Sequence, residues 1–318
     1  MLKGFQQGRE LKPRIPRTIH NLKHGLDRSK FSMPFVSVGR ENSANIDLYY
    51  EDHGSGEPAI LIHGYPLNGA SWEKQLPDLL EAGYRVITYD RRGFGQSSKP
   101  TIGYDYDTFA QDLHRLIGQL DLKDVALVGF SMGGGEVARY IGNYGTKGIS
   151  KAAFLGAIPP YLQKAPDNPE GVDKGVFDGI QKAIAVDRYA WFTEFFKNFY
   201  NTDQLLGTRI SEQAVQASWN VATTASPTAS YACVPTWGTD FRKDIARVNI
   251  PTLVVHGDAD RIVPFQASGA RTAKMIPGAK LVVVKNGPHN IAWTHPDHVN
   301  PALVSFLKEE EKLVTTPA

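Results

Sequence analysis

The sequence contains a serine whose flanking residues match a motif that surrounds catalytic serine nucleophiles. Ser131 is the centre of Gly129-Phe-Ser-Met-Gly133, which matches the pattern G-x-S-x-G. This pattern needs glycines because a serine at the apex of a strand-to-helix turn has strained backbone, and its neighbours must approach without a Cβ atom. A helix that begins after Ser131 would direct its free N–H groups toward an anion beside the serine. Ser131 is therefore the candidate nucleophile.

A serine nucleophile needs a base, and the base needs a carboxylate that orients it. In chains with this turn the order is serine, acid, histidine, each at the end of a different strand. Asp260 follows the next-to-last expected strand and His289 follows the last one. We therefore predict a triad of Ser131, His289 and Asp260. Asp258 is the rival acid, for which an Asx turn within the same loop is the alternative role.

The oxyanion formed during attack on a carbonyl needs two N–H donors. Met132 is the first candidate, because it follows the nucleophile at the start of the expected helix. The second donor should come from the loop after the expected strand 59–63. Tyr65 is the candidate there, since Pro66 has no N–H. The residues expected to wall the substrate pocket are Phe130, Trp191, Phe195 and Ile262.

Two further groups of residues could bind a metal or a dinucleotide, but we do not favour these roles. His295, Asp297 and His298 resemble a metal cluster, but they fall where the last expected helix begins, so an exposed first turn is the simpler interpretation. Gly93-Phe-Gly95 lacks the rest of a dinucleotide-binding fingerprint. We expect neither a metal nor a cofactor.

The elements that would position these residues alternate between strands and helices. Short apolar runs that indicate buried strands lie at 59–63, 85–89, 125–128, 152–156, 251–256 and 281–284. Apolar residues at helical spacing predict helices between them, for example over 106–120. Such alternation gives a mostly parallel sheet covered by helices on both faces. A further strand at 46–51 is expected at an antiparallel edge.

The alternation is interrupted between residues 159 and 248, where aromatic residues recur in helical stretches. We expect this segment to be a helical cap, inserted into an α/β core formed by residues 33–158 and 249–318. Residues 1–33 carry eight Lys and Arg against two acids. The segment 1–32 is expected to be a disordered basic extension, with a transit peptide as the alternative.

The composition argues against other classes of protein. The net charge of +2 gives no reason to expect a nucleic-acid partner. No apolar run approaches the roughly 20 residues that span a membrane. Cys233 is the single cysteine, which fits a reducing compartment, so we expect a cytoplasmic protein.

The motifs together resemble a known family. They are similar to those of the cofactor-free (non-heme) chloroperoxidases and arylesterases of the α/β-hydrolase superfamily, and they are His63-Gly-Tyr-Pro66, Tyr89-Asp-Arg-Arg-Gly-Phe-Gly-Gln-Ser-Ser98, Gly129-Phe-Ser-Met-Gly-Gly-Gly-Glu136 and His256-Gly-Asp-Ala-Asp260. The resemblance runs from about Met33 to the closing helix. It implies an α/β-hydrolase fold with a helical cap, the triad and oxyanion donors named above, no metal or heme, and often a homo-oligomer.

The resemblance also implies an activity. Members of the family hydrolyse small esters, and many transfer the acyl group to hydrogen peroxide to give a peracid that oxidises halide. We therefore expect a serine esterase with perhydrolase activity on small esters or carboxylic acids. A lactonase or γ-lactamase that uses the same residues on a cyclic lactone or lactam is the alternative enzyme. A non-catalytic member that binds a small ligand is the alternative of another class, which labelling with a fluorophosphonate would distinguish.

Overall fold

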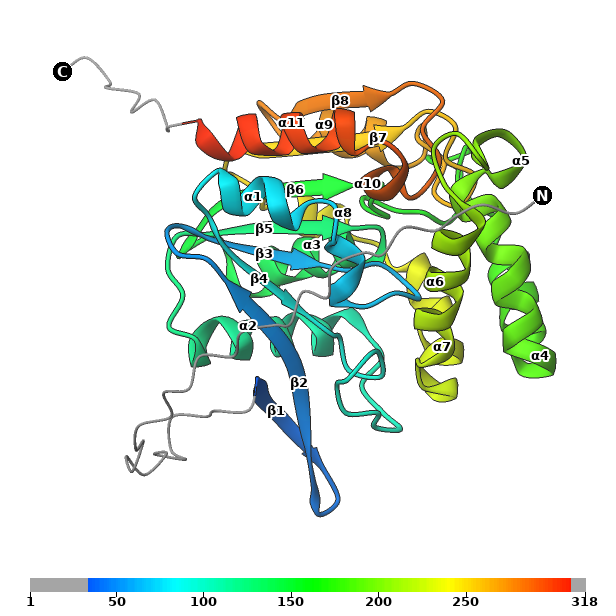
Figure 1. The fold of residues 1–318 in the computed structure, drawn as a ribbon, viewed down its shortest axis with the longest axis horizontal. Coiled ribbons are helices and arrows are strands. Elements are labelled where there is room, and N and C mark those ends of the chain that lie inside the picture. Colours follow the sequence, from blue (N-terminus) through cyan, green and yellow to red (C-terminus); the bar gives the residue numbers. More distant parts are fainter. Residues whose placement is uncertain (1–33, 310–318) are drawn as a thin grey trace, which may run out of the picture. The chain divides into compact units, whose positions relative to one another are not determined.

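A computed structural model describes residues 34–309, so the extension expected over residues 1–32 lies outside the described range. The described chain forms an eight-stranded sheet in the order β1-β2-β4-β3-β5-β6-β7-β8 (Figure 1). The strands are β1 (Phe35–Glu41), β2 (Ala44–His53), β3 (Pro58–Ile62), β4 (Arg85–Tyr89), β5 (Val125–Phe130), β6 (Ile149–Leu155), β7 (Thr252–Gly257) and β8 (Lys280–Val284). From β4 to β8 neighbouring strands are parallel, as the alternation predicted.

The first two strands are antiparallel to the rest of the sheet. β2 pairs with β1 on one side and with β4 on the other. The expectation of an edge position for residues 46–51 was therefore wrong, because β1 forms the edge. β1 gave a weak sequence signal, since only Val36 and Val38 of this strand are buried.

Helices follow the strands along the chain. They are α1 (Leu76–Glu81), α2 (Tyr106–Gln119), α3 (Met132–Tyr144), α4 (Lys174–Tyr200), α5 (Thr202–Leu205), α6 (Glu212–Thr223), α7 (Pro227–Ala232), α8 (Arg242–Ile245), α9 (Gly269–Met275), α10 (Ile291–Thr294) and α11 (Pro296–Lys308). Short 3₁₀ helices span Gly69–Trp72 and Val234–Gly238. In the part of the chain described here, no helix combines the length and the apolarity that crossing a membrane requires.

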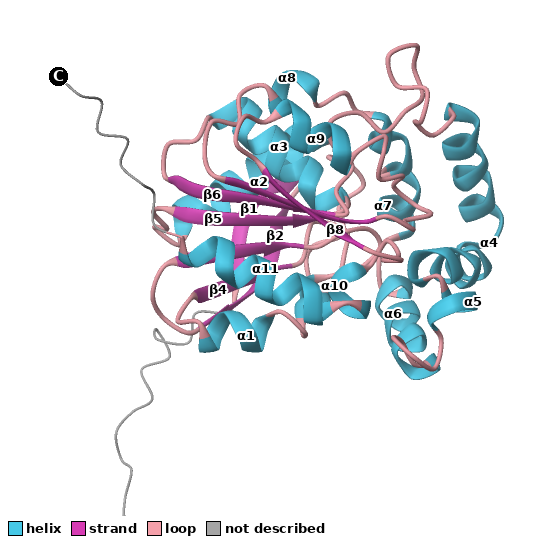
Figure 2. Cartoon of the chain, turned by 90° about the horizontal axis from the view of Figure 1, so that it is seen from above, coloured by secondary structure: helices cyan, strands magenta, loops and turns pink. Residues whose placement is uncertain are grey.

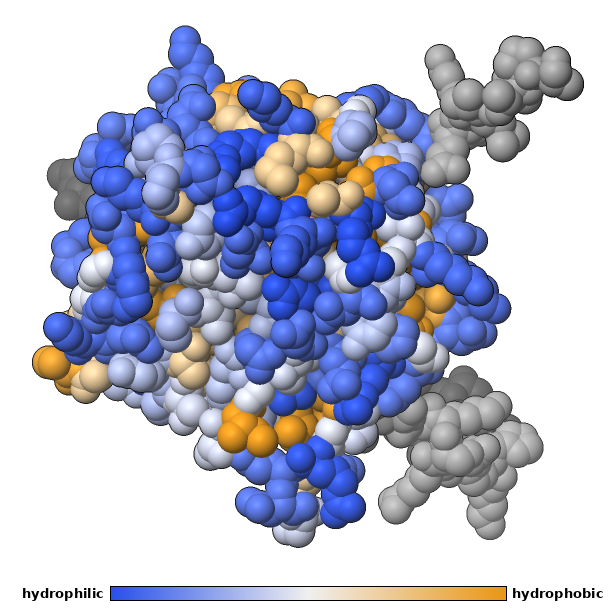
Figure 3. Space-filling model, turned by 180° about the vertical axis from the view of Figure 1, so that it is seen from behind, coloured by the Kyte–Doolittle hydropathy of each residue, from blue (hydrophilic) through white to orange (hydrophobic). Residues whose placement is uncertain are grey.

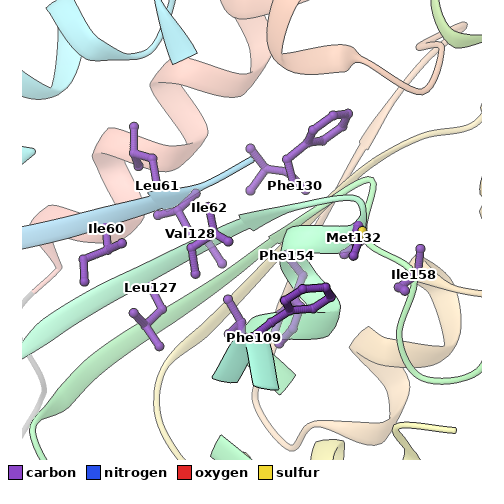
Figure 4. Close-up of a cluster of buried hydrophobic side chains, with 14 of the residues drawn as sticks. Ile60, Leu61, Ile62, Phe109, Leu127, Val128, Phe130, Met132, Phe154 and Ile158 are labelled. Atoms are coloured by element: carbon purple, nitrogen blue, oxygen red, sulfur yellow. The ribbon is translucent and has the colours of Figure 1, made fainter. Parts of the chain in front are cut away.

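The sheet is covered on both faces. Figure 2 shows α2, α3 and α9 on one face and α1 and α11 on the other. The strands β5 and β7 are consequently buried along their whole length, which explains their continuous apolar runs. In Figure 4, Leu61 and Phe130 point to one side of the sheet, whereas Ile60 and Phe109 lie on the other. The expected α/β arrangement is confirmed.

Residues 159–248 contain α4 to α8. α4, α5, α6 and α7 lie beyond the carboxyl ends of the parallel strands (Figure 1), whereas α8 packs beside α3 (Figure 2). α4 bends at Asp187, where φ is −156° and ψ is 94°. The Asp187 carboxylate accepts hydrogen bonds from the N–H groups of Tyr189 and Ala190, both at 3.0 Å, and so caps the second half of the helix. This half carries the aromatic side chains that face the core.

Apolar side chains reach the surface mostly in small groups between polar ones, as the face drawn in Figure 3 shows. The exposed apolar residues include Leu281 and Val283 of the edge strand β8, with 41% and 44% of their surfaces accessible. Most of the apolar surface is instead buried between the sheet and its two helical layers. The carboxyl ends of the central strands therefore project from a rigid core.

Candidate active site

Ser131 lies at a sharp turn between β5 and α3. Its φ of 54° and ψ of −119° are strained for a residue with a side chain. A Cβ atom on Gly129 would lie 2.5 Å from the Gly133 carbonyl oxygen, and one on Gly133 would lie 2.2 Å from the Ile62 carbonyl oxygen. Glycine is therefore required at both positions, and the turn presents the serine hydroxyl above the end of the sheet.

His289 lies next to this hydroxyl. Its Nε2 is 2.8 Å from Ser131 Oγ, and its Nδ1 is 2.7 Å from Asp260 Oδ2. With an ionised Asp260, which can only accept, Nδ1 carries the proton and Nε2 accepts from the serine. The three side chains lie at the ends of β5, β7 and β8, and at most 8% of the surface of each residue is exposed. The structure thus brings together the three residues that the sequence order selected.

The Asp260 carboxylate is fixed by several donors. Its Oδ1 accepts from the N–H groups of Ile262 (2.9 Å) and Val263 (2.8 Å), and His256 Nε2 lies 3.2 Å from Oδ2. Burial by itself would raise the pKa of Asp260, but His289 and His256 together hold it well below its usual range. The carboxylate therefore stays ionised while it orients the imidazole.

Asp258 lies on the outside of the same loop. Its Oδ1 accepts a 2.6 Å hydrogen bond from the N–H of Asn286, and the structure does not bring it to His289. This contact links the loops that follow β7 and β8. This contact between two loops differs from the Asx turn within one loop that was considered for Asp258.

The candidate oxyanion donors lie on both sides of Ser131. Met132 is the first residue of α3, at the helix end whose N–H groups have no intrahelical partners. The loop with Tyr65 adjoins Ser131, since a Cβ atom on Gly64 would lie 2.8 Å from Ser131 Cβ. The side chain of Tyr65 points toward residues 159–248, where its hydroxyl donates to the Ser230 carbonyl at 2.9 Å.

A cavity of about 300 Å³ opens above Ser131 and His289. Its walls are mostly apolar, and three of the four expected pocket residues, Trp191, Phe195 and Ile262, line it. The other lining residues are Tyr65, Ile158, Leu162, Val172, Val176, Phe177, Ile180, Glu194, Asn198, Trp237, Arg261 and Val263. Val176, Phe177 and Ile180 were not among the expected pocket residues, although their helical spacing is a signal that could have identified them. Trp237, which was also not expected there, has no such signal.

Phe130 is not among the residues that line this cavity, so the expectation for it needs correction. It is 3% exposed and packs behind the candidate triad, with its ring centroid 5.1 Å from that of His289 and 6.0 Å from that of Phe199. The reason is its position as the last residue of β5, where the side chain points to the α1 and α11 side of the sheet (Figure 4).

The alternative metal residues are in part engaged with other groups. Asp297 forms a 2.8 Å ion pair with Arg209, and His295 Nδ1 lies 2.8 Å from the Thr294 hydroxyl. Within residues 34–309, no group of three or more His, Cys, Asp or Glu residues is arranged to hold a metal ion.

Known proteins resemble this chain in sequence and in fold. A family model described as the alpha/beta hydrolase fold matches residues 58–296. A Synechocystis protein that carries the provisional name non-heme chloroperoxidase is 60% identical, over 87% of this chain and 100% of its own. The crystal structure of a bromoperoxidase from Bacillus anthracis has a TM-score of 0.83 at 50% identity, and the match covers 86% of this chain and 99% of the other. A bifunctional esterase/perhydrolase of Acinetobacter calcoaceticus is 30% identical, over 83% of this chain and 96% of its own.

The family model covers most of the chain, so it defines the class of the protein. The protein is an α/β-hydrolase enzyme. Within this class the chain belongs to the family of non-heme chloroperoxidases and esterases. The resemblance of its motifs to that family is thereby confirmed.

Proposed function

We propose that this enzyme hydrolyses small carboxylic esters through an acyl-enzyme on Ser131, and that hydrogen peroxide competes with water for the acyl group. The observation that carries the proposal is the chain of contacts from Ser131 Oγ to His289 Nε2 (2.8 Å) and from His289 Nδ1 to Asp260 Oδ2 (2.7 Å). These distances and the buried, ionised Asp260 are what activation of a serine by a general base requires.

In the acylation step, Ser131 Oγ attacks the ester carbonyl while His289 Nε2 takes its proton. Asp260 keeps the imidazole in the correct tautomer and stabilises the imidazolium. The N–H groups of Met132 and Tyr65 hold the oxyanion. The imidazolium then gives its proton to the departing alcohol oxygen, and the acyl group remains bonded to Ser131.

In the second step, His289 removes a proton from the incoming nucleophile. Water gives the carboxylic acid, and hydrogen peroxide gives the peracid; in both cases Ser131 recovers its proton from the imidazolium. Pro66 fixes φ near −65°, so the preceding Tyr65 carbonyl has a set direction in which it can accept a hydrogen bond from peroxide. The apolar walls formed by Trp191 and Phe195 limit bulk water at the site, which favours the better nucleophile.

The cavity supports a small substrate with an apolar acyl group. Its volume of about 300 Å³ is at the lower end of the range for small-molecule sites, and few of its lining side chains are charged. The Acinetobacter relative is named for both esterase and perhydrolase activity, which is the pair of activities proposed here. The substrate class proposed is therefore short esters and, for perhydrolysis, short carboxylic acids.

Purified enzyme is expected to form peracetic acid from acetic acid and hydrogen peroxide, with water as the other product. Acetic acid acylates Ser131 with loss of water, and peroxide then removes the acetyl group. The released peracid oxidises bromide to hypobromous acid and returns acetic acid. The measurement is the bromination of monochlorodimedone in the presence of acetate, peroxide and bromide. The decrease in absorbance of monochlorodimedone reports the rate of bromination.

Two controls make this experiment decisive. Omission of acetate should abolish bromination, since bromide is oxidised by the peracid and not at the protein. Ser131→Ala should reduce bromination to the rate without enzyme. Hydrolysis of p-nitrophenyl acetate without any peracid above the Ser131→Ala background would leave the esterase proposal standing and reject perhydrolysis.

A further inference from the structure

A buried ion pair lies beside the two backbone segments proposed to form the oxyanion hole. Arg91 Nη2 is 2.7 Å from Glu136 Oε2, and Arg91 Nε donates to the same oxygen at 2.8 Å. The other carboxylate oxygen, Oε1, accepts from the Tyr89 hydroxyl. Arg91 is 1% exposed and Glu136 is fully buried. Burial of two charges is costly, so the pair is not explained by stability alone.

Arg91 also holds the loop that leads to Tyr65. Its Nη2 donates to the His63 carbonyl at 3.0 Å, and its backbone N–H donates to His63 Nε2 at 2.9 Å. His63 Nδ1 in turn donates to the Gly64 carbonyl at 2.9 Å. Burial and, second to it, the charge of Arg91 lower the pKa of His63, which keeps this ring neutral and able to accept at Nε2. The two residues before Tyr65 are therefore fixed by one arginine.

Glu136 connects the same arginine to α3. It lies four residues after Met132, so the two residues share a face of the helix one turn apart. The first turn of α3 already touches the loop, because a Cβ atom on Gly133 would lie 3.0 Å from the His63 carbonyl oxygen. Arg91 thus binds the loop through His63 and the helix through Glu136.

We propose that Arg91 and Glu136 are positioning residues for the oxyanion hole. The ion pair holds the Tyr65 loop and the start of α3 at the separation that lets both N–H groups reach one oxyanion. Preorganised donors lose their effect when they are displaced, because the transition state no longer receives both hydrogen bonds. The inference rests on the proposed acyl-enzyme mechanism, in which that oxyanion forms.

The test variant is Arg91→Met/Glu136→Gln, which removes both charges, leaves no unpaired buried ion, and retains an acceptor for the Tyr89 hydroxyl. We expect kcat for p-nitrophenyl acetate to fall by about 10- to 100-fold, with KM changed by less than about threefold. The inhibition constant of phenylboronic acid, whose serine adduct places an oxygen in the oxyanion hole, should rise by a similar factor. Each rate is divided by the amount of protein that a fluorophosphonate labels after a long incubation. Unfolded protein then does not contribute to the measured kcat.

The neighbouring pair Arg92–Asp112 supplies a matched control. Arg92 donates to both oxygens of Asp112 at 2.6 and 2.7 Å, and both residues are buried. This pair joins the loop after β4 to α2, and among the described residues no hydrogen bond from the Arg92 side chain reaches His63 or α3. Arg92→Met/Asp112→Asn should therefore lower the melting temperature while kcat per labelled chain stays within about threefold of the wild type.

Equal kcat values for the two double variants would overturn the proposal, as would a fall in kcat with no change in boronate affinity. If Arg91→Met/Glu136→Gln gives no folded protein, the isosteric variant Glu136→Gln is tested against Asp112→Asn in the same way, with a smaller change in the same direction expected. The activity of Ser131→Ala distinguishes a failure of the proposed function from a failure of the positioning role proposed for Arg91 and Glu136. A fully active Ser131→Ala would reject the proposed function itself, whereas an inactive one beside two similar double variants would reject only this inference.

Discussion

Ser131→Ala is expected to lower kcat for p-nitrophenyl acetate by roughly 10⁴-fold or more, the scale seen when triad members are removed from serine hydrolases. The reason is that the proposed acyl-enzyme can no longer form, while the cavity and the candidate oxyanion donors remain. Alanine keeps the Cβ atom and so meets the same backbone strain at φ 54° that serine meets. The variant should therefore fold, with a melting temperature close to that of the wild type.

The measurement is steady-state hydrolysis, together with the mass of the protein after incubation with a fluorophosphonate. The wild type should gain one adduct, on the peptide that contains Ser131, and the variant should gain none. Ser150→Ala is the matched control. Ser150 lies at the start of β6, remote from the strand ends that carry the site, and its hydroxyl donates to the Asp124 carbonyl. More than a tenth of wild-type activity in Ser131→Ala would contradict the assignment.

Asp260→Asn is expected to lower kcat by about 10⁴-fold, the loss typical of the wrong histidine tautomer. The N–H groups of Ile262 and Val263 both point at the position of Oδ1, so an asparagine must place its carbonyl oxygen there. Its NH₂ group then faces His289 Nδ1 and donates to it. Nδ1 loses its proton to Nε2, and Nε2 can no longer accept the proton of Ser131.

Asp258→Asn is the matched control for this prediction, because it makes the same substitution two residues away in the same loop. An asparagine there can still accept the hydrogen bond from the Asn286 N–H, so kcat should change by less than about threefold. Both variants are compared by kcat for p-nitrophenyl acetate at neutral pH and by melting temperature. Equal losses, or a larger loss for Asp258→Asn, would assign the catalytic acid to Asp258.

Much of the fold could be predicted because its signals are local. The buried strands β3, β5 and β7 are continuous apolar runs, and their burial on both faces of a parallel sheet is the cause of that pattern. α2 has the apolar spacing of an amphipathic helix. β1 had no comparable signal, since two buried valines on an edge strand do not distinguish a strand from a loop.

The candidate triad was predictable for a similar reason. The turn at Ser131 requires glycines at fixed positions, so the requirement is written into five consecutive residues. His289 and Asp260 were then selected by their order along the chain and by their places after strands. The order along the chain does not distinguish Asp260 from Asp258, because both follow the same strand. The choice depends on which carboxylate the loop after β7 directs toward His289.

The sequence by itself determined the class of fold and selected the candidate nucleophile and the candidate base, because backbone strain and hydrophobic periodicity act between residues close in the chain. Only the tertiary structure decided that Phe130 packs behind the site, that Trp237 lines the cavity, and that Arg91 meets both His63 and Glu136. Arg91 and Glu136 are 45 residues apart in the sequence. Contacts of this kind are set by the order of the strands and the packing of helices on the sheet, and no pattern of neighbouring residues encodes them.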